Sequence, residues 1–298
     1  MNSVKTSYFR KKITDCFYLA LALVIVMLQV ACKKNAETIG TGQLVLEGYL
    51  YQGEKVDSIH FTSSLSFESL DTVYPAVLDA QASIIWNGKS YALQSIGGGY
   101  YNCADSNLLV IVGNTYSIVV NHNGSSTSSS TVIPSNPTGV IISDTMILID
   151  TTFSFGPPGL GNTSTNGTSN LTISWDNPDN GYYYIVIEST DPNAAAIVRG
   201  NDNFPGGNGM GPGRIFRIRS QPFQGNNYIL QSNSLEKYGK HVAKVYRVNQ
   251  EYADLYMNRQ QDSRNLSEPI TNVTNGLGIF TGFSSTVVQF IVKNAAKN

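Results

Sequence analysis

The sequence is poor in the side chains on which metalloenzymes and histidine-dependent hydrolases rely. Among 298 residues there are only three cysteines and three histidines. No His-Glu-x-x-His segment and no pair of closely spaced cysteines occurs, so a zinc site is not indicated. His60, His122 and His241 have no nucleophile and orienting partner at a recognisable spacing. We therefore expect a protein that is not an enzyme and needs neither metal nor cofactor; a hydrolase assembled across space is the less favoured alternative.

Basic segments are also missing. The chain has 20 Lys and Arg against 21 Asp and Glu, a formal net charge of −1. Beyond the N-terminal segment, no basic run is longer than Lys33-Lys34. Proteins that bind nucleic acid gather Lys and Arg to neutralise phosphates. Nucleic acid is therefore not expected as a partner.

Only one long apolar run is present, and it lies near the N-terminus. Residues 16–31 are almost free of polar side chains and follow a basic head at residues 5–12. As a helix the run would span about 24 Å, which is short of the roughly 30 Å hydrocarbon core of a bilayer. A basic head, a short apolar run and a small residue before a break predict a cleavable signal peptide over residues 1–31. A transmembrane anchor is the alternative.

Cys32 decides which kind of export the signal directs. The stretch Leu28-Gln29-Val30-Ala31-Cys32 resembles the lipoprotein pattern of Leu, a variable residue, a small residue and Cys, except that Gln29 stands where Leu is usual. We predict that cleavage leaves Cys32 as the lipidated first residue. Several acyl chains, at about 0.8 kcal/mol per buried CH₂, would anchor the protein stably. The mostly polar residues 32–42 are expected to form a tether.

Cys103 is then the single remaining thiol, and it cannot form an intramolecular disulfide. Its neighbours in the sequence include no histidine that would activate it. We interpret Cys103 as a small apolar filler of a strand rather than as a nucleophile or metal ligand.

The mature chain of 267 residues is longer than a usual single domain, so two domains are expected. Its short apolar stretches recur every 8 to 12 residues or so between turn residues, as in β-sandwiches. The clearest is a hairpin at residues 82–93, in which Asn87-Gly88 supplies the two positive φ angles of a type I′ turn. We predict an Ig-like or prealbumin-like sandwich over residues 43–136, with the polar residues 124–131 as a flexible loop.

The second predicted domain covers residues 137–298 and has long loops rich in Gly, Ser and Asn. A strand that ends in Trp175, a proline-containing turn and a tyrosine-rich strand resemble the B and C strands of a fibronectin type III domain. Strand alternation places Trp175 in the core, and it places Tyr182 and Tyr184 on the face opposite Tyr183.

One short helix near the C-terminus completes an all-β fold class of two sandwich modules. Asn249 can cap this helix, and Glu251 lies in its first turn, where the helix dipole favours an anion. The helix is expected to end near Asp262.

Two segments resemble ligand sites but are interpreted as loops. Residues 206–213 are rich in glycine, but no Gly-Lys-Ser/Thr follows, so a phosphate loop is not indicated. Residues 176–181 partly resemble a calcium loop, yet Pro178 occupies a liganding position and Ile187 stands where a bidentate Glu is needed. Trp86, beside the hairpin tip, is the one candidate for an aromatic side chain that faces a ligand; core packing is an equal alternative.

The C-terminal segment 268–280 resembles the end of a family of Bacteroidetes lipoproteins that carry domain of unknown function 4249. The shared ending contains Pro269, Asn272, Gly276, Gly278 and Phe280, and we interpret these residues as structural. The likeness extends over most of residues 43–292, through the hairpin, the Gly113-Asn114-Thr115-Tyr116 strand start and the tyrosine-rich strand.

The resemblance implies an outer-membrane lipoprotein, on the cell surface or on the periplasmic face. Such proteins are commonly encoded beside TonB-dependent receptors. By that analogy, this chain is expected to be a non-catalytic accessory or binding component of a nutrient-uptake system, with a glycan or peptide as its ligand. A structural or adhesive cell-surface protein is the alternative.

Overall fold

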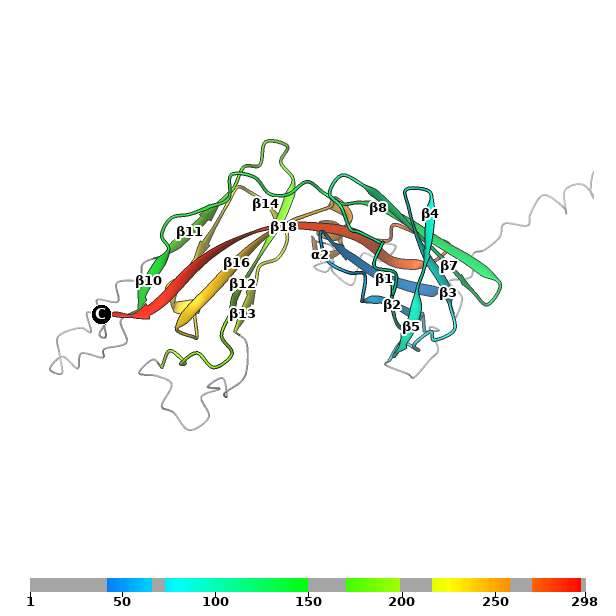
Figure 1. The fold of residues 1–298 in the computed structure, drawn as a ribbon, viewed down its shortest axis with the longest axis horizontal. Coiled ribbons are helices and arrows are strands. Elements are labelled where there is room, and N and C mark those ends of the chain that lie inside the picture. Colours follow the sequence, from blue (N-terminus) through cyan, green and yellow to red (C-terminus); the bar gives the residue numbers. More distant parts are fainter. Residues whose placement is uncertain (1–41, 66–72, 150–169, 199–215, 258–269, 296–298) are drawn as a thin grey trace, which may run out of the picture. The chain divides into compact units, whose positions relative to one another are not determined.

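The structure is a computed structural model that describes residues 42–65, 73–149, 170–198, 216–257 and 270–295 (Figure 1). The predicted signal peptide, Cys32 and the glycine-rich segment 206–213 lie outside these residues. Strands dominate the described part, which has one α-helix, α2 (Gln250–Met257), and one 3₁₀ turn, η1 (Ser232–Ser234). The predicted fold class, all-β with a short helix near the C-terminus, is confirmed. Residues 258–262, the predicted end of the helix, lie outside the described residues.

The described strands form three sheets. The largest has ten strands in the order β13-β12-β16-β18-β1-β2-β6-β5, with β10 beside β18 and β14 beside β12. Its strands are β1 (Leu44–Tyr51), β2 (Ile59–Ser63), β5 (Gln94–Gly97), β6 (Tyr100–Asn102), β10 (Met146–Ile149), β12 (Tyr182–Ser189), β13 (Arg217–Arg219), β14 (Phe223–Gln224), β16 (Gly239–Val248) and β18 (Leu277–Asn294).

The other two sheets each face one part of the large sheet. A five-stranded sheet has the order β17-β8-β7-β3-β4, and a three-stranded sheet has the order β15-β11-β9. Their strands are β3 (Gln81–Trp86), β4 (Lys89–Ala92), β7 (Thr115–His122), β8 (Ser125–Val132), β17 (Val273–Thr274), β9 (Ile141–Ile142), β11 (Leu171–Ser174) and β15 (Asn227–Leu230).

The first core is built from the five-stranded sheet and from β1, β2 and β6. Strand β7 shows the cause: alternate residues Tyr116, Ile118 and Val120 are fully buried, and the residues between them are not. The predicted hairpin is formed by β3 and β4, with φ of 50° at Asn87 and 74° at Gly88. These left-handed angles suit a type I′ turn, whose twist matches that of the flanking strands.

The second core is built from the three-stranded sheet and from β10, β12, β16 and the second half of β18. Trp175 is buried in it, as predicted. Strand β12 is buried on both faces, which is why it is a continuous apolar run. Tyr183 packs in the second core, whereas Tyr182 and Tyr184 belong to a separate aromatic cluster on the other face of the sheet. The predicted division of the three tyrosines is thus present.

Strand β18 belongs to both cores (Figure 1, red). Its first half pairs in parallel with β1, and its second half pairs antiparallel with β16. Phe280 packs in the first core and Phe290 in the second. Residues 273–283 were assigned to the second predicted domain, 137–298, but they contribute side chains to the first core. A strand that returns to an early sheet leaves no break in the local sequence pattern.

The structure corrects the flexible loop predicted over residues 124–131. Residues 125–131 lie in β8, which pairs with β7 along its whole length and with β17. Thr127, Ser129 and Thr131 are buried. Thr127 Oγ1 donates a hydrogen bond to the Asn275 carbonyl (2.9 Å), and Ser129 Oγ donates one to the Asn272 carbonyl (2.7 Å). Small hydroxyl side chains are tolerated inside because their polar atoms are paired.

None of the described helices is both long and apolar enough to cross a membrane.

Candidate functional site

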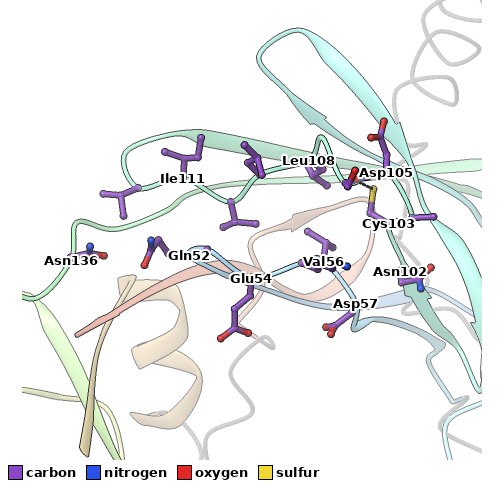
Figure 2. Close-up of a pocket in the computed structure, with 17 residues that line it drawn as sticks. Gln52, Glu54, Val56, Asp57, Asn102, Cys103, Asp105, Leu108, Ile111 and Asn136 are labelled. Carbon is purple, nitrogen blue, oxygen red and sulfur yellow. Dashed lines mark hydrogen bonds between the residues drawn. The ribbon is translucent and has the colours of Figure 1, made fainter. Parts of the chain in front are cut away.

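A pocket of about 750 Å³ lies in the described part of the chain (Figure 2). Two segments line most of it: residues 52–57, which follow β1, and residues 102–112, which follow β6. Both are loops at the ends of strands, where binding residues are commonly displayed on a rigid scaffold. We call this feature the loop pocket.

Backbone hydrogen bonds hold the two segments together. The Gly53 N–H donates to the Val110 carbonyl (2.9 Å), and the Cys103 N–H donates to the Val56 carbonyl (2.7 Å). Tyr116, buried in the first core, accepts a hydrogen bond at its hydroxyl from the Ile111 N–H (2.9 Å). The loop pocket is therefore largely preformed.

The apolar side chains of the second segment alternate between buried and exposed, and residues 108–112 all line the pocket. Leu108 and Val110 are buried, whereas Leu109 is 54 % exposed and Ile111 is 41 % exposed. This alternation follows from an extended backbone, in which successive side chains point to opposite sides. Two large aliphatic side chains are thus left for a ligand or partner to cover.

The charged side chains of the loop pocket are mainly acidic. Glu54, Asp57 and Asp105 line it together with one cation, Lys55. Hydrogen bonds from the backbone and side chain of Asn107 lower the pKa of Asp105. Asp105 stays ionised at neutral pH and pairs with Lys89 (3.6 Å). Glu54 and Asp57 are the carboxylates that favour a partner with positive charge.

The pocket offers binding groups rather than a reactive pair. Cys103 lines it, but the nearest polar partner of its thiol is the Asp105 carbonyl, at 3.8 Å. No histidine lines the pocket. The described residues also include no cluster of three or more His, Cys, Asp or Glu side chains that could hold a metal ion.

The three histidines lie apart from one another. His60 stacks on Tyr100 (4.2 Å between ring centroids) and lies 3.6 Å from Glu47. His122 pairs with Asp79, and His241 is buried in the second half of the fold.

Trp86, the predicted ligand-facing aromatic residue, packs at the edge of the first core. Its ring stacks on Tyr116 (5.9 Å, 14° between planes), and its Nε1–H donates to Asn114 Oδ1 (3.3 Å). Trp86 does not line the loop pocket. These contacts fit the packing alternative better than the binding one.

Residues 176–181, which partly resemble a calcium loop, form a turn that side chains close. Asn177 accepts a hydrogen bond from the Gly181 N–H (2.7 Å) and donates one to the Gly225 carbonyl (2.9 Å). Asp179 forms an ion pair with Arg247. The side chains of Asn177 and Asp179 are thus used within the protein.

The residues of the C-terminal sequence ending come together where β18 enters the first core; Pro269 lies outside the described residues. Asn272 binds both backbone groups of Phe280: the Phe280 N–H donates to Asn272 Oδ1 (2.9 Å), and Asn272 Nδ2 donates to the Phe280 carbonyl (2.7 Å). Gly278 has a φ of +105°, and a Cβ there would lie 2.0 Å from the Leu46 carbonyl oxygen. A Cβ at Gly276 would also meet backbone, at 2.9 Å. In this structure Asn272, Gly276 and Gly278 therefore have structural roles.

Sequence reasoning did not find the loop pocket. Its two segments are about 50 residues apart in the sequence, and neither contains a motif with a known chemistry. The only local signal is the apolar run at residues 108–112, and a run of this length indicates a short strand rather than a pocket.

The fold and the loop pocket define an all-β protein with a solvent-open binding pocket. The family model described as "Domain of unknown function (DUF4249)" matches residues 33–289, so the chain belongs to that family. The resemblance to domain of unknown function 4249 is thereby confirmed.

Comparison with other proteins adds little. Among solved structures, the chain is similar to the crystal structure of domains A168-A170 from titin, with 11 % identity, a TM-score of 0.20, and coverage of 85 % of this chain and 67 % of that chain. A TM-score this low supports no further conclusion. No curated protein matches the chain.

Proposed function

We propose that this protein is a non-catalytic binding lipoprotein of the outer membrane. It is held there by acyl chains on Cys32, and it docks with a TonB-dependent receptor to assist the uptake of a nutrient. The lipoprotein pattern before Cys32 supports the anchor, and membership of the family supports the receptor context.

The loop pocket is the observation that carries the proposal. A preformed concavity with two exposed aliphatic side chains, Leu109 and Ile111, and an excess of carboxylates suits a protein segment with apolar and basic side chains. An extracellular or periplasmic loop of a receptor can supply such a segment. The polar side chains around the pocket fix the orientation of the bound segment, and Leu109 and Ile111 supply the apolar surface that is buried on binding.

An adhesive or structural role is the second candidate. It would be favoured by a broad exposed apolar surface without a concave site. The described surface has exposed apolar side chains, among them Val73, Tyr74 and Leu78 close together in the sequence and Ile229 on β15, as well as the loop pocket. The pocket favours the receptor-binding role.

Copurification tests the proposal. The tagged full chain is recovered from detergent-solubilised outer membranes, and its partners are identified by mass spectrometry. We expect a TonB-dependent receptor to copurify. Recovery of the chain without a receptor would contradict the docking role.

A pair of variants shows whether the loop pocket makes the contact. Ile111→Ala removes an exposed side chain of the pocket, and Ile229→Ala removes a similarly exposed side chain (55 %) far from it in the sequence. We expect Ile111→Ala to weaken receptor binding about fivefold or more, as for an apolar contact at the centre of an interface, and Ile229→Ala to leave it unchanged. Equal effects of the two variants would place the contact elsewhere.

A further inference from the structure

A second cavity, of about 400 Å³, lies on the face of the ten-stranded sheet that is turned away from the second core. The alternation of side chains along β12 and β16 places the lining residues of these strands on this face. Ile187 and Ala243 point into the second core, and their neighbours Glu188 and Lys244 line the cavity. Tyr51 at the end of β1, Glu54 shortly after it, and Tyr252 and Tyr256 of α2 also line the cavity. We call it the tyrosine cavity.

The walls of the tyrosine cavity are aromatic. Five tyrosines line it, which is the largest share of any residue type there. Tyr184 stacks on Tyr246 (4.7 Å between centroids, 5° between planes), and Tyr51 meets Tyr246 edge-on at 6.1 Å. These contacts fix the rings, so little side-chain entropy remains to be lost when a ligand binds.

The phenol groups are available as neutral hydrogen-bonding groups. Burial raises the pKa of Tyr51 to about 12 and also raises the pKa values of Tyr184 and Tyr246. Among the described residues, no hydrogen bond pairs the hydroxyls of these three tyrosines, whereas Tyr252 donates to the Tyr256 hydroxyl (3.1 Å). A neutral phenol can both donate and accept. The cavity thus presents hydroxyls suited to a polyhydroxylated ligand.

The cations Arg217, Arg219 and Lys244 line the cavity together with two carboxylates, Glu54 and Glu188. Arg217 and Lys244 both pair with Glu188, at 2.8 and 2.9 Å. Burial opposes ionisation of Glu188, but the hydrogen bonds and charges of Lys244 and Arg217 outweigh it and lower the pKa of this carboxyl. Arg219, at the end of β13, forms no ion pair with any described residue. A guanidinium in this position is suited to bidentate recognition of an anionic group.

A peptide strand fits this surface less well than a sugar. The backbone groups of β12 are used on both sides, by β13 and β14 on one and by β16 on the other. The wall formed by β12 and β16 therefore presents side chains. Among the described residues, the sheet edge beside the cavity is β13, which is only three residues long and offers little backbone to a peptide that adds as a further strand. Sugar rings are recognised by aromatic walls and by hydroxyl groups, which this cavity provides. Its volume is near the lower limit of common ligand sites, about 300 to 1,000 Å³, so the ligand is short.

We propose that the tyrosine cavity binds a short anionic oligosaccharide, with its acidic group on Arg219 and its hydroxyls among the tyrosines. This role goes beyond receptor docking at the loop pocket, and it can fail while docking stands. The anionic group can be the carboxylate of a uronic acid or a sulfate ester, because a guanidinium pairs with either.

Isothermal titration calorimetry of the full chain in detergent tests the proposal with trigalacturonate, its methyl ester and a sulfated trisaccharide. We expect one or both anionic sugars to bind, and the uncharged methyl ester to bind at least tenfold more weakly, because a hydrogen bond to a charged group exceeds one to a neutral group. Arg219→Ala should weaken binding of the anionic sugar about tenfold or more. Tyr246→Phe, which keeps the ring, should weaken it by about two- to tenfold.

Lys240→Ala is the matched control, because it removes one exposed positive charge of β16 that does not line the cavity. It should leave the affinity unchanged. Equal binding of the methyl ester and the acid, or equal loss in the Lys240 and Arg219 variants, would overturn the proposal. So would a failure of all three sugars to bind. Binding of only the sulfated sugar, lost in Arg219→Ala, would support the site and assign the anion as sulfate.

Discussion

Asn272 is expected to be among the most destabilising positions for substitution outside the apolar cores. Its side chain pairs with both backbone groups of Phe280, a residue whose own side chain is fully buried. Asn272→Ala would leave an N–H and a carbonyl without partners, at about 1–3 kcal/mol each. The two costs together come to about 2–6 kcal/mol. Because both hydrogen bonds are only partly buried, we expect the free energy of unfolding to fall by the lower half of this range, about 2–4 kcal/mol.

Urea denaturation of the purified protein measures this loss, and two further variants interpret it. Asn272→Asp keeps an acceptor for the Phe280 N–H but sets a carboxylate against the Phe280 carbonyl. We therefore expect it to be destabilised as well, and to recover in part below about pH 4, where the carboxyl protonates and can donate. Asn226→Ala, at an exposed asparagine, should stay within about 0.5 kcal/mol of wild type. If Asn272→Ala also fell within that limit, the reasoning would be refuted.

Three further predictions concern other residues. Gly278→Ala combines a positive φ with a Cβ 2.0 Å from the Leu46 carbonyl, so it should lower the free energy of unfolding by about 2–5 kcal/mol; an unchanged thermal midpoint would contradict this. Burial lowers the pKa of His241 from 6.5. The unfolded chain therefore binds a proton more readily, and stability should fall as the pH drops from about 6.5 towards the lower folded-state pKa. His241→Phe should remove this dependence, and denaturation midpoints across that range would show whether it does. Cys32→Ser should abolish the incorporation of labelled fatty acid into the protein; unchanged incorporation would exclude a lipid anchor at Cys32.

Local patterns predicted the parts of the fold that local contacts determine. The hairpin with Asn87-Gly88, the burial of Trp175 and the opposite faces of Tyr183 and Tyr184 all follow from turn chemistry and from the two-residue period of strands. Each involves neighbours that are close in the sequence.

Strand β8 was missed because hydropathy cannot distinguish its two faces. Both consist of Ser and Thr, and the buried hydroxyls find their partners about 145 residues later in the chain. One local signal was present. Asn123-Gly124, with φ of 50° and 75°, is a second turn of the Asn-Gly type, directly after a predicted strand. A hairpin signal of this kind should outweigh a polar composition in the residues that follow it.

The pockets were missed for a related reason. The loop pocket joins residues 52–57 to residues 102–112, and the tyrosine cavity joins β1, β12, β13, β16 and α2. Periodicity indicated which face of β12 each tyrosine occupies, but not which distant cation lies beside it. Arg219 in particular had no sequence feature that distinguished it from other surface arginines.

Sharing of β18 between the two cores predicts that they unfold together. Loss of β18 from the second core would remove Phe290, and its loss from the first would remove Phe280, so neither core keeps its packing when the strand detaches. The two tryptophans report the cores separately: Trp86 packs against the first and Trp175 lies in the second. In Trp175→Phe the fluorescence of Trp86 reports the first core, and in Trp86→Phe the fluorescence of Trp175 reports the second. Circular dichroism measures the change in stability that each substitution itself causes. After correction for that change, we expect the two urea midpoints to be equal. Two separate transitions in either variant would instead mean that the cores unfold independently, and that the pairing of β18 with β1 and β16 does not couple them.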